Sequence, residues 1–591
     1  MPLTKYINPL MELNYKIHEN ENLFNDLVNS DMTDFASIQN YVPIYESFFV
    51  LNDDNYNKIN LNHVNYIKEI KEKINNNIFH CTIDSIKQPN QNKAKKVFFK
   101  FSPLLDPIKY ITGKYDDYPS EIIHLPTFTK RNKPTHFKIK DVNNSAYVDS
   151  FFTYLTSQLQ HIHGFTHGLD FYGSFLGIKN NHLQDITDDY DYLEESSYFY
   201  KNQGIKFKLE GGNSVDIASN SSRTNKPQLN MSDDSVNDLE ISNLDELTEV
   251  HSIFDSPQEN ILEFTKNNLE LLYHDKDNSS KTNSNASSLK SECSSRSSNT
   301  DNDSTHGSES DGDSDCESDG EDKNSKDSES DISSIEEDPI FVKINKFPVQ
   351  LIALECCEKT LDSLILDKIL SDKEWGSIVI QILMTLITYQ KAFKLTHNDL
   401  HSNNVMYIPT DKKHIYYTYK KKNYKVPTFG RLFKIIDYGR AIYKYKKKTI
   451  CSDSFHKEGD ASTQYNCEPY LDENKPRLEP NFSFDLCRLG CSIFDYLIED
   501  LKEVNELDDN PIIKIITDWC KDDKGRNIMY KVNGQERYPE FKLYKMIART
   551  VHNHTPDKVL ENVFFDRYLT GKIKKKEEVM NIDKIPEYHN D

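Results

Sequence analysis

The chain has 591 residues, enough for more than one domain's core, and its mean hydropathy of -0.71 is polar for a fully globular protein. Its net charge of -22 gives a nucleic-acid partner no support, and its ten scattered cysteines include no C-x-x-C pair, which argues against a zinc ribbon or a disulfide framework. No stretch approaches the roughly 18 apolar residues of a membrane span, and the first residues lack a signal-peptide core, so we expect a soluble, intracellular protein with no membrane partner.

Residues 1–80 mix apolar runs with Asn-rich polar runs, and we interpret them as an N-terminal extension. The run from Ile44 to Leu51 fits a strand or a short helix, because so short an apolar run has no diagnostic period. Apolar side chains at helical spacing between Val64 and Ile74 predict a helix.

The first informative strand is Val97–Phe101, which follows a polar turn at Gln88–Asn92. Its Lys100 has two interpretations. It is either a solvated lysine on a half-buried strand, which is the usual case, or a lysine that binds the α- and β-phosphates of a nucleotide. Motifs further along the chain favour the second interpretation. No G-x-G-x-x-G precedes the strand, so the usual glycine-rich phosphate cover is missing or replaced.

An amphipathic helix is predicted next, across Ala146–Leu159, because its apolar residues follow the i, i+3, i+4, i+7 pattern. Asp149 is the only acid on this helix and is therefore the candidate partner of Lys100. A strand is then predicted at Phe171–Gly177.

Three histidines lie between that helix and that strand: His161, His163 and His167. A metal site is one interpretation, but carboxylate or thiolate partners at ligand spacing are missing nearby. We therefore favour ordinary polar residues that lead into the strand.

The composition changes between residues 181 and 338, where Ser, Asp and Asn dominate. Such a tract buries too little apolar surface to offset its chain entropy, so we expect a mostly disordered insertion within a folded lobe. Serines followed by acids suit acidophilic protein kinases, and a solvating spacer is an equally good interpretation.

Order is expected to return at Pro339, and the apolar run from Val349 to Glu358 fits a buried strand that leads into a hinge. The backbone of such a hinge could hydrogen-bond to an adenine edge. Helices are predicted at Leu361–Leu370 and, with a longer apolar stripe, at Trp375–Ile387.

The stretch Leu395–Val405 contains H-x-D-L-x-x-x-N-V, the pattern of a phosphotransferase catalytic loop. In that pattern Asp399 accepts the proton of the attacking hydroxyl, and Asn404 holds a metal that bridges the phosphates. A strand at Val405–Ile408 follows, and then a Lys- and Tyr-rich hairpin or loop at 410–430. This segment could touch nucleic acid, but a solvated hairpin is the better interpretation.

Two further motifs follow in the order that a kinase requires. Asp437-Tyr438-Gly439 comes directly after an apolar strand, which is the context of a metal-binding D-F-G element. Asp485 opens a D-x-x-x-L-G pattern on an apolar helix face, where a buried carboxylate needs hydrogen-bond donors.

With these motifs the chain resembles the eukaryotic-type protein kinase superfamily. Asp399-Leu400-His401 and Ile436-Asp437-Tyr438 are especially similar to haspin-type kinases, and the Asn-, Tyr- and Lys-rich background resembles predicted kinases of giant DNA viruses. The resemblance implies an α+β, two-lobed fold with ATP and Mg²⁺ in the cleft and transfer to Ser or Thr of a protein substrate. If the chain is viral, host cytoplasm or the virion is implied.

The resemblance also implies a role for each matching residue and a division of the chain. Asp399 matches the catalytic base, Asn404 and Asp437 the metal ligands, and Lys100, paired with Asp149, the phosphate-binding lysine. Leu354, Glu355 and Cys356 align with the start of the hinge. The implied divisions are an extension (1–80), the first part of a small β-rich N-lobe (81–180), the insertion (181–338), the N-lobe end and hinge (339–358), a mostly helical C-lobe (359–575) and a charged tail (576–591).

The sequence departs from the family pattern at several positions. Asn398 stands where Arg is usual, so a phosphorylated activation segment would lack its usual anchor. His401 stands where Ser/Thr kinases carry Lys, which implies a partial charge towards the γ-phosphate. No clear A-P-E ends the activation segment. Arg537 and Arg549 are alternative candidates for stabilising that segment.

Three functions compete at this point. The first is an active Ser/Thr protein kinase, which works by positioning and charge neutralisation. The second is a small-molecule phosphotransferase, since H-x-D-L-H-x-x-N also occurs in relatives of aminoglycoside and choline kinases. The third is a pseudokinase scaffold, prompted by the missing glycine loop. Retention of Asp399, Asn404 and Asp437 together favours the first.

Overall fold

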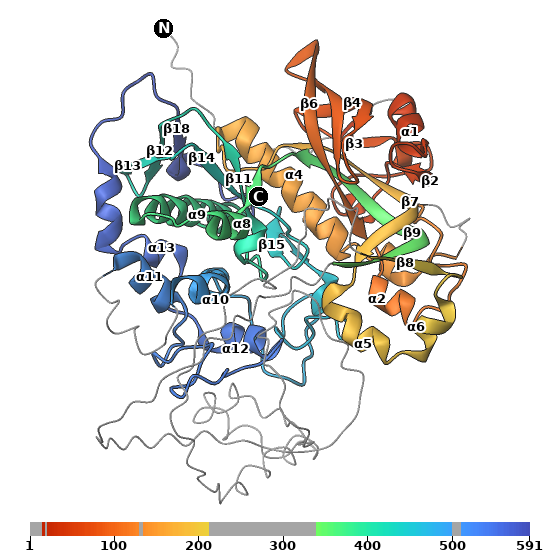
Figure 1. Ribbon diagram of the computed structural model, residues 1–591. Helices are drawn as coiled ribbons and strands as arrows, with labels where there is room; N and C mark the ends of the chain where they lie inside the picture. The colour runs from red at the N-terminus through yellow and green to blue at the C-terminus, as the bar shows by residue number, and fades with distance from the viewer. Residues whose placement is uncertain (1–14, 18–19, 129–133, 212–338, 499–509, 591) are drawn as a thin grey trace, which may run out of the picture. The chain divides into compact units, whose positions relative to one another are not determined.

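Seven antiparallel strands, drawn from both sides of the acidic insertion, form one sheet (Figure 1). The computed structural model describes residues 15–17, 20–128, 134–211, 339–498 and 510–590, and they have a mixed α+β fold. The strands lie in the order β2-β7-β9-β6-β5-β4, and β8 also pairs with β9. Their bounds are β2 (Phe35–Gln39), β4 (Asn65–Lys73), β5 (Ile78–Ser85), β6 (Gln88–Pro103), β7 (Phe171–Asp185), β8 (Phe207–Gly211) and β9 (Ile340–Glu355).

Strand β9 lies between β6 and β7 in this sheet, and it confirms the buried strand predicted before the hinge. Every residue from Val349 to Leu354 is buried, as expected for a strand covered on both faces. Its antiparallel register places Ile352 opposite Lys100 of β6. The predicted strands around Lys100 and at Phe171–Gly177 are also confirmed.

Helix α4 (Ser145–His163) contacts β7 and β9 and confirms the predicted amphipathic helix (Figure 1). Asn144 caps its first turn by accepting the backbone N–H of Ala146. Gly164 ends the helix at φ 67°, a left-handed value that glycine adopts without strain. Since α4 is buried from Ala146 to Leu159, Asp149 is held inside the protein.

The helix predicted between Val64 and Ile74 is wrong, because this segment is strand β4. It pairs with β5, and the register shifts between Ile67 and Glu69 and between Ile70 and Glu72. Each shift marks an irregularity in the two-residue alternation, so buried Ile67 and Ile70 lie three residues apart, which imitates helical spacing. The polar turn predicted at Gln88–Asn92 is also wrong: these residues begin β6, and the chain turns at 86–87.

The boundary placed at residue 181 for the insertion is too early. Residues 181–211 complete β7 and form α5 (Tyr190–Glu194), α6 (Ser197–Asn202) and β8. Four apolar side chains in this polar stretch are buried, and the overall composition does not reveal them: Ile186, Leu193, Phe199 and Phe207. The expectation of disorder concerns mainly residues 212–338, which lie outside the described residues.

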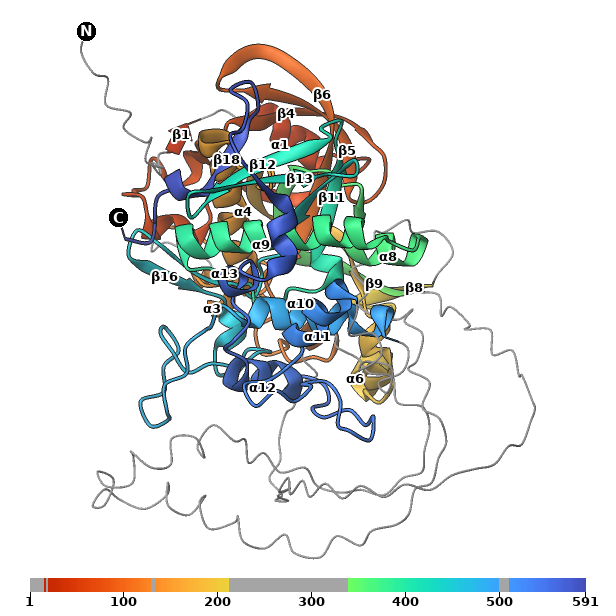
Figure 2. The same ribbon diagram turned by 90° about the vertical axis from the view of Figure 1, so that its left-hand side faces the viewer.

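Six helices with described bounds follow β9: α8 (Leu361–Asp367), α9 (Asp372–Phe393), α10 (Phe484–Leu497), α11 (Pro511–Trp519), α12 (Lys542–Thr550) and α13 (Pro556–Val559). The first two confirm the predicted helices. A capping box between Ser371 and Glu374 starts α9. In Figure 2, α9 lies between strand β13 (Lys422–Pro427) and helix α11, both of which it contacts. Before β9, the described residues also form the helices α1 (Glu21–Val28), α2 (Pro107–Ile111) and α3 (Phe137–Lys140).

Smaller sheets surround α9 and the loop at His397. One has the order β10-β11-β14, another β17-β13-β12-β18, and β15 pairs with β16. The bounds are β10 (Lys359–Thr360), β11 (Val405–Pro409), β12 (His414–Tyr419), β14 (Arg431–Ile435), β15 (Ile442–Tyr445), β16 (Lys448–Cys451), β17 (Leu569–Thr570) and β18 (Val579–Asn581), and a further pair joins β1 (Tyr15–Ile17) to β3 (Ile59–Leu61). The hairpin predicted at 410–430 is confirmed as β12–β13.

The ends of the described chain contribute to these sheets. Residues 35–85, within and just beyond the predicted extension, supply β2, β4 and β5. Residues of the predicted charged tail supply β18, and Tyr588 is fully buried. The 3₁₀ helix Pro43–Ser47 covers the first half of the run that fitted either a strand or a short helix. Among the described helices, none has both the length and the apolar character needed to cross a membrane.

Candidate functional site

The loop that carries Asp399 is held from behind by the carboxylate of Asp485 on α10. Asp485 accepts the backbone N–H of His397 at 2.9 Å and that of Asn398 at 3.0 Å, and its side chain is fully buried. Burial raises the pKa of Asp485, and the nearby His397 opposes this rise. The buried carboxylate thus has the hydrogen-bond donors that it requires, and these donors belong to the backbone of the loop.

The same loop brings Asp399, Asn404 and Asp437 together. Asn404 donates through Nδ2 to the carbonyl of Asp399 at 2.9 Å, and its own carbonyl accepts the N–H of Ile436 at 3.0 Å. His397 Nε2 bonds to the carbonyl of Ile436 at 2.9 Å. Both bonds go to Ile436, which follows β14 and directly precedes Asp437. They therefore hold Asp437 next to the loop. The three predicted residues lie around one place, although 38 residues separate the first from the last.

Lys100 connects the sheet to this place. Its Nζ lies 2.8 Å from Asp149 Oδ2 on α4 and 2.8 Å from Asp437 Oδ1. Asp149 also accepts the backbone N–H of Tyr438 at 2.8 Å. The predicted pairing of Lys100 with Asp149 is confirmed.

Lys100 attracts both carboxylates of this trio, but burial and the nearby Asp437 charge still leave the pKa of Asp149 above its usual value. Burial alone would lower the pKa of Lys100, but Asp149 and Asp437 raise it above its usual value. Burial would raise the pKa of Asp437, but Lys100 holds it below the ordinary range. At neutral pH the site therefore presents a lysine cation and an ionised Asp437 carboxylate.

Two residues of the site have left-handed backbone conformations. Asn398 has φ 65° and Asp437 has φ 63°. Asn and Asp tolerate this region better than most residues, because their short side chains bond locally. Asn398 does so here: its Nδ2 donates to the carbonyls of Thr396 and Arg440, and its Oδ1 accepts the hydroxyl of Tyr465 at 2.7 Å. The residue that replaces the usual Arg therefore joins the loop to the segment after Asp437.

His401 does not supply the partial positive charge that the sequence implies. It is 5% exposed, and burial lowers its pKa to about 4, so the ring is neutral at pH 7. Its Nε2 accepts from Asn404 Nδ2 at 3.0 Å. The predicted partial charge was wrong because the sequence does not show how deeply the His401 ring is buried. The neutral ring instead orients the side chain of Asn404.

The amide and carboxylate oxygens of Asn404 and Asp437 fit a magnesium ion. Asn404 uses its nitrogen in the bonds to Asp399 and His401, which turns Oδ1 away from them. Oδ1 of Asp437 forms the ion pair with Lys100, and the Asp437 side chain is 32% exposed. Mg²⁺ usually takes one or two protein oxygens together with substrate phosphates and water. The described residues, this site included, contain no group of three or more His, Cys, Asp or Glu side chains that could hold a metal, so a magnesium ion here would depend on phosphate and water ligands as well.

The predicted hinge residues lie at the end of β9. Leu354 is buried, and Glu355 and Cys356 are partly exposed. Glu355 Oε2 accepts from Lys434 Nζ of β14 at 2.6 Å, and its backbone N–H donates to the carbonyl of Asp170 at 2.9 Å. The end of the sheet is thereby tied to the strand that leads to Asp437.

The segment after Asp437 is held by charged side chains. Arg440 forms an ion pair with Asp460. Asp453 pairs with Lys138 at 3.2 Å and accepts the first backbone N–H of α4, from Ser145, at 2.9 Å. Of the two candidate arginines, Arg549 reaches this segment, where it donates to the carbonyl of Thr463 at 3.0 Å, while Arg537 bonds to the carbonyls of Asn527 and Tyr530.

The three histidines take separate partners. His161 and His163 lie in the last turn of α4, not in the connection to the next strand as predicted, and only His167 follows the helix. His161 lies 2.7 Å from Asp170, His163 lies 2.5 Å from the hydroxyl of Tyr588, and His167 bonds to the carbonyl of Phe433. Burial lowers the pKa of His167 to about 4. Each ring therefore joins neighbouring elements.

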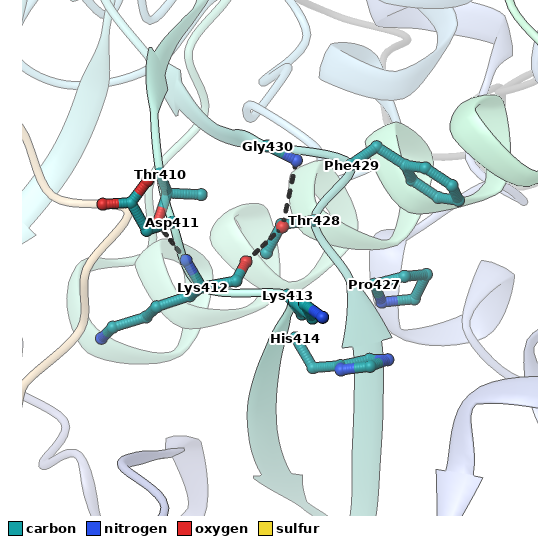
Figure 3. A pocket seen from close by; sticks show the side chains of 9 residues that line it. All are labelled: Thr410, Asp411, Lys412, Lys413, His414, Pro427, Thr428, Phe429 and Gly430. Carbon is teal, nitrogen blue, oxygen red and sulfur yellow. Dashed lines mark hydrogen bonds between the residues drawn. The ribbon is translucent and has the colours of Figure 1, made fainter.

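A hollow of about 410 Å³ lies elsewhere, beside the hairpin β12–β13 (Figure 3). Its lining comes from 410–414 and 427–430, and the hydroxyl of Thr428 connects its two sides by bonding to the carbonyl of Lys412. The lining contains none of the residues predicted for the nucleotide site.

Sequence reasoning missed several polar residues at the site. Tyr544 of α12 donates its hydroxyl to Asp399 Oδ1 at 2.9 Å, and no pattern in the sequence points to it. Lys434 and Asp460 were missed as well. Lys434 left a signal, since a single lysine inside the apolar run of β14 must find a partner if it is buried.

Comparisons with known proteins add no family. A scan against protein-family models finds none that matches the chain, and a search among curated proteins finds no relative. The function must therefore be argued from the chain's own residues.

Proposed function

We propose that this protein is an ATP-dependent kinase that transfers the γ-phosphate to Ser or Thr of a protein substrate. The observation that carries the proposal is the double contact of Lys100 with Asp149 and Asp437, next to the loop that joins Asp399 to Asn404. A lysine strand, an acidic helix, a catalytic loop and a D-F-G-like turn are the parts that protein kinases combine.

The proposed two-lobed arrangement follows from the same parts. The seven-stranded sheet with α4 would be the N-lobe, and the helices from α8 onward would be the C-lobe. Leu354, Glu355 and Cys356 lie between them, at the point where β9 ends. In this arrangement ATP would lie between Lys100 and the loop at Asp399.

Each residue has a role in the proposed reaction. Lys100 would neutralise the α- and β-phosphates, and Asp399 would orient the substrate hydroxyl and accept its proton. Asn404 and Asp437 would hold Mg²⁺, which screens the phosphate charge when bound. Phosphoryl transfer needs little covalent help from the protein, so positioning and charge account for most of the catalysis.

A protein substrate is favoured over a small alcohol by the segment between Asp437 and α10. This segment is long, and it is fixed to the site by the pairs Arg440–Asp460 and Asn398–Tyr465. A fixed, extended segment beside the catalytic loop offers a surface on which a polypeptide can lie.

The deciding experiment is a transfer assay with γ-labelled ATP and magnesium on generic protein substrates. The wild-type chain is compared with Asp399→Asn, which keeps the size of the side chain and removes the base. We expect label in the protein substrate with the wild type and a loss of at least about a hundredfold with the variant, which is the usual scale of general-base catalysis. Acid hydrolysis should release phosphoserine or phosphothreonine.

Three results would count against the proposal. Equal label with both proteins would indicate a contaminant. Transfer confined to small alcohols such as choline or an aminoglycoside would favour the small-molecule phosphotransferase. Magnesium-dependent ATP binding with no transfer to any acceptor would favour the scaffold.

A further inference from the structure

Tyr544 places a hydroxyl on the side chain proposed as the general base. Its Oη donates to Asp399 Oδ1 at 2.9 Å, across 145 residues of sequence. Tyr544 is 1% exposed and Asp399 is 8% exposed, so the bond is shielded from water. A buried hydrogen bond to a carboxylate is short, directional and stronger than one between neutral groups.

The ring of Tyr544 is in contact with two arginines and a second aromatic ring. The guanidinium carbon of Arg488 lies 4.9 Å from the ring centroid and that of Arg440 lies 5.6 Å from it. The ring of Phe541 stacks on it at 5.4 Å and an interplanar angle of 20°. These contacts restrict the ring to one orientation, so its hydroxyl is a rigid donor.

This bond assigns different roles to the two oxygens of Asp399. Oδ1 is engaged by Tyr544, and no described residue donates to Oδ2. The backbone on either side is also fixed, since the N–H of Asp399 donates to His397 Nδ1 at 3.3 Å and its carbonyl accepts from Asn404. A carboxylate held at one oxygen and along its backbone can direct the other oxygen at a substrate hydroxyl.

We propose that Tyr544 is a positioning residue for the general base: its hydroxyl fixes Asp399 Oδ1 so that Oδ2 receives the proton of the substrate hydroxyl. The proposal rests on the proposed kinase function. It extends that function to a residue on α12, which carries none of the motifs that resemble a kinase.

The test is Tyr544→Phe in the full chain, which keeps the ring and its contacts with Arg440 and Arg488. With a Ser-containing protein substrate we expect kcat to fall about tenfold, because the carboxylate loses its fixed orientation. The KM for ATP should stay within about twofold, since Tyr544 does not touch the nucleotide-binding residues. A fall in kcat at an unchanged KM separates a lost orientation of the base from a general structural defect, which would change both constants.

The matched control is Tyr530→Phe, which removes a tyrosine hydroxyl that donates to Asp495 Oδ1 at 2.9 Å, a bond outside the proposed site. Its kcat should stay within about twofold of the wild-type value, since surface or remote substitutions usually have small effects. An equal fall in kcat in both variants, or a KM for ATP that rises as much as kcat falls in Tyr544→Phe, would overturn the proposal. A wild-type chain with no transfer at all would remove the proposed function and this role together. A wild type that transfers phosphate while Tyr544→Phe keeps full kcat would remove only this role.

Discussion

Asp149 of α4 accepts the backbone N–H of Tyr438 at 2.8 Å, while its other oxygen lies 2.8 Å from Lys100 Nζ. One buried carboxylate therefore connects a helix, a strand of the large sheet and the Asp437-Tyr438-Gly439 turn. The helix and the turn cannot shift independently without breaking one of these bonds. Nucleotide binding should accordingly depend on Asp149 as much as on Lys100.

Asp149→Ala should weaken the binding of Mg²⁺–ATP by about tenfold or more, because Lys100 loses one of its two carboxylates and Tyr438 loses its acceptor. Asp149→Asn keeps the acceptor and removes only the charge, so its loss should be smaller. The measurement is a nucleotide titration by calorimetry at fixed magnesium. Unchanged affinity in Asp149→Ala would show that the pair has no part in nucleotide binding.

Asp485 offers a prediction about stability. Asp485→Ala leaves the backbone N–H groups of His397 and Asn398 buried without their acceptor, which should cost about 2–4 kcal/mol of unfolding free energy. Chemical denaturation measures this loss. Asp495→Ala is the control on the same helix, since Asp495 accepts only a tyrosine hydroxyl, from Tyr530 at 2.9 Å. Equal losses in the two variants would contradict the special role of Asp485.

The segment after Asp437 should be in place without phosphorylation. Arg440 already has the carboxylate of Asp460, and Asn398 already binds Tyr465, so no phosphate is needed to order these residues. If the proposed kinase activity exists, phosphatase treatment should leave it unchanged, while Asp460→Ala should lower kcat by about tenfold because a buried ion pair is broken. An activity that disappears with the phosphatase would contradict this prediction.

The sequence was sufficient for much of the site because its motifs are short and local. Asp399 and Asn404 lie on one loop, and Asp437 and Asp485 each sit at a fixed place beside an apolar run. The strand of Lys100 and the helix of Asp149 were predicted from periodicity, and their pairing followed from the resemblance. Local sequence patterns therefore identified those residues whose environment is set by their neighbours in the sequence.

The remaining features depend on contacts that a local pattern does not contain. The irregular register of β4 made a strand look like a helix, and the buried Leu193, Phe199 and Phe207 were hidden by polar neighbours. The charge predicted for His401 was wrong because the burial of its ring is set by the surrounding fold, which the local sequence does not show. Tyr544 approaches Asp399 from a helix 145 residues away, so only the tertiary structure could reveal it.

Glu355 and Lys434 form an ion pair in which Lys434 is much the more buried residue. Removing Glu355 alone should therefore lower the free energy of unfolding. Lys434 is 1% exposed, and Glu355→Ala would leave its ammonium with the carbonyl of Gly168 alone. Because Glu355 is 22% exposed, we expect a moderate cost of about 2–3 kcal/mol, below that of a fully buried pair. Glu355→Ala combined with Lys434→Met should recover most of the loss in urea denaturation. Equal stability of the single and double variants would show that the loss does not come from the unpaired charge of Lys434.

His182 of β7 should make the protein sensitive to acid. It is 2% exposed, its ring stacks on Phe347 with centroids 5.3 Å apart, and burial together with Lys179 lowers its pKa to about 3. In the unfolded chain the pKa of histidine is about 6.5. Above that pH the ring is neutral in both states and costs nothing. As the pH falls from about 6.5 towards 3, only the unfolded state gains the proton, so the free energy of unfolding must fall.

His182→Phe keeps an aromatic ring against Phe347 and removes this proton uptake. Relative to the variant, the wild type should lose about 1.4 kcal/mol per pH unit below pH 6, or on the order of 3 kcal/mol by pH 4. Urea unfolding at pH 7, 6, 5 and 4 measures the difference, and His167 and His401 contribute equally to both proteins. His80→Phe is the control, because that side chain lies at the surface of β5 and is 45% exposed. Parallel curves for wild type and His182→Phe would show that the ring at 182 takes up its proton in the folded protein.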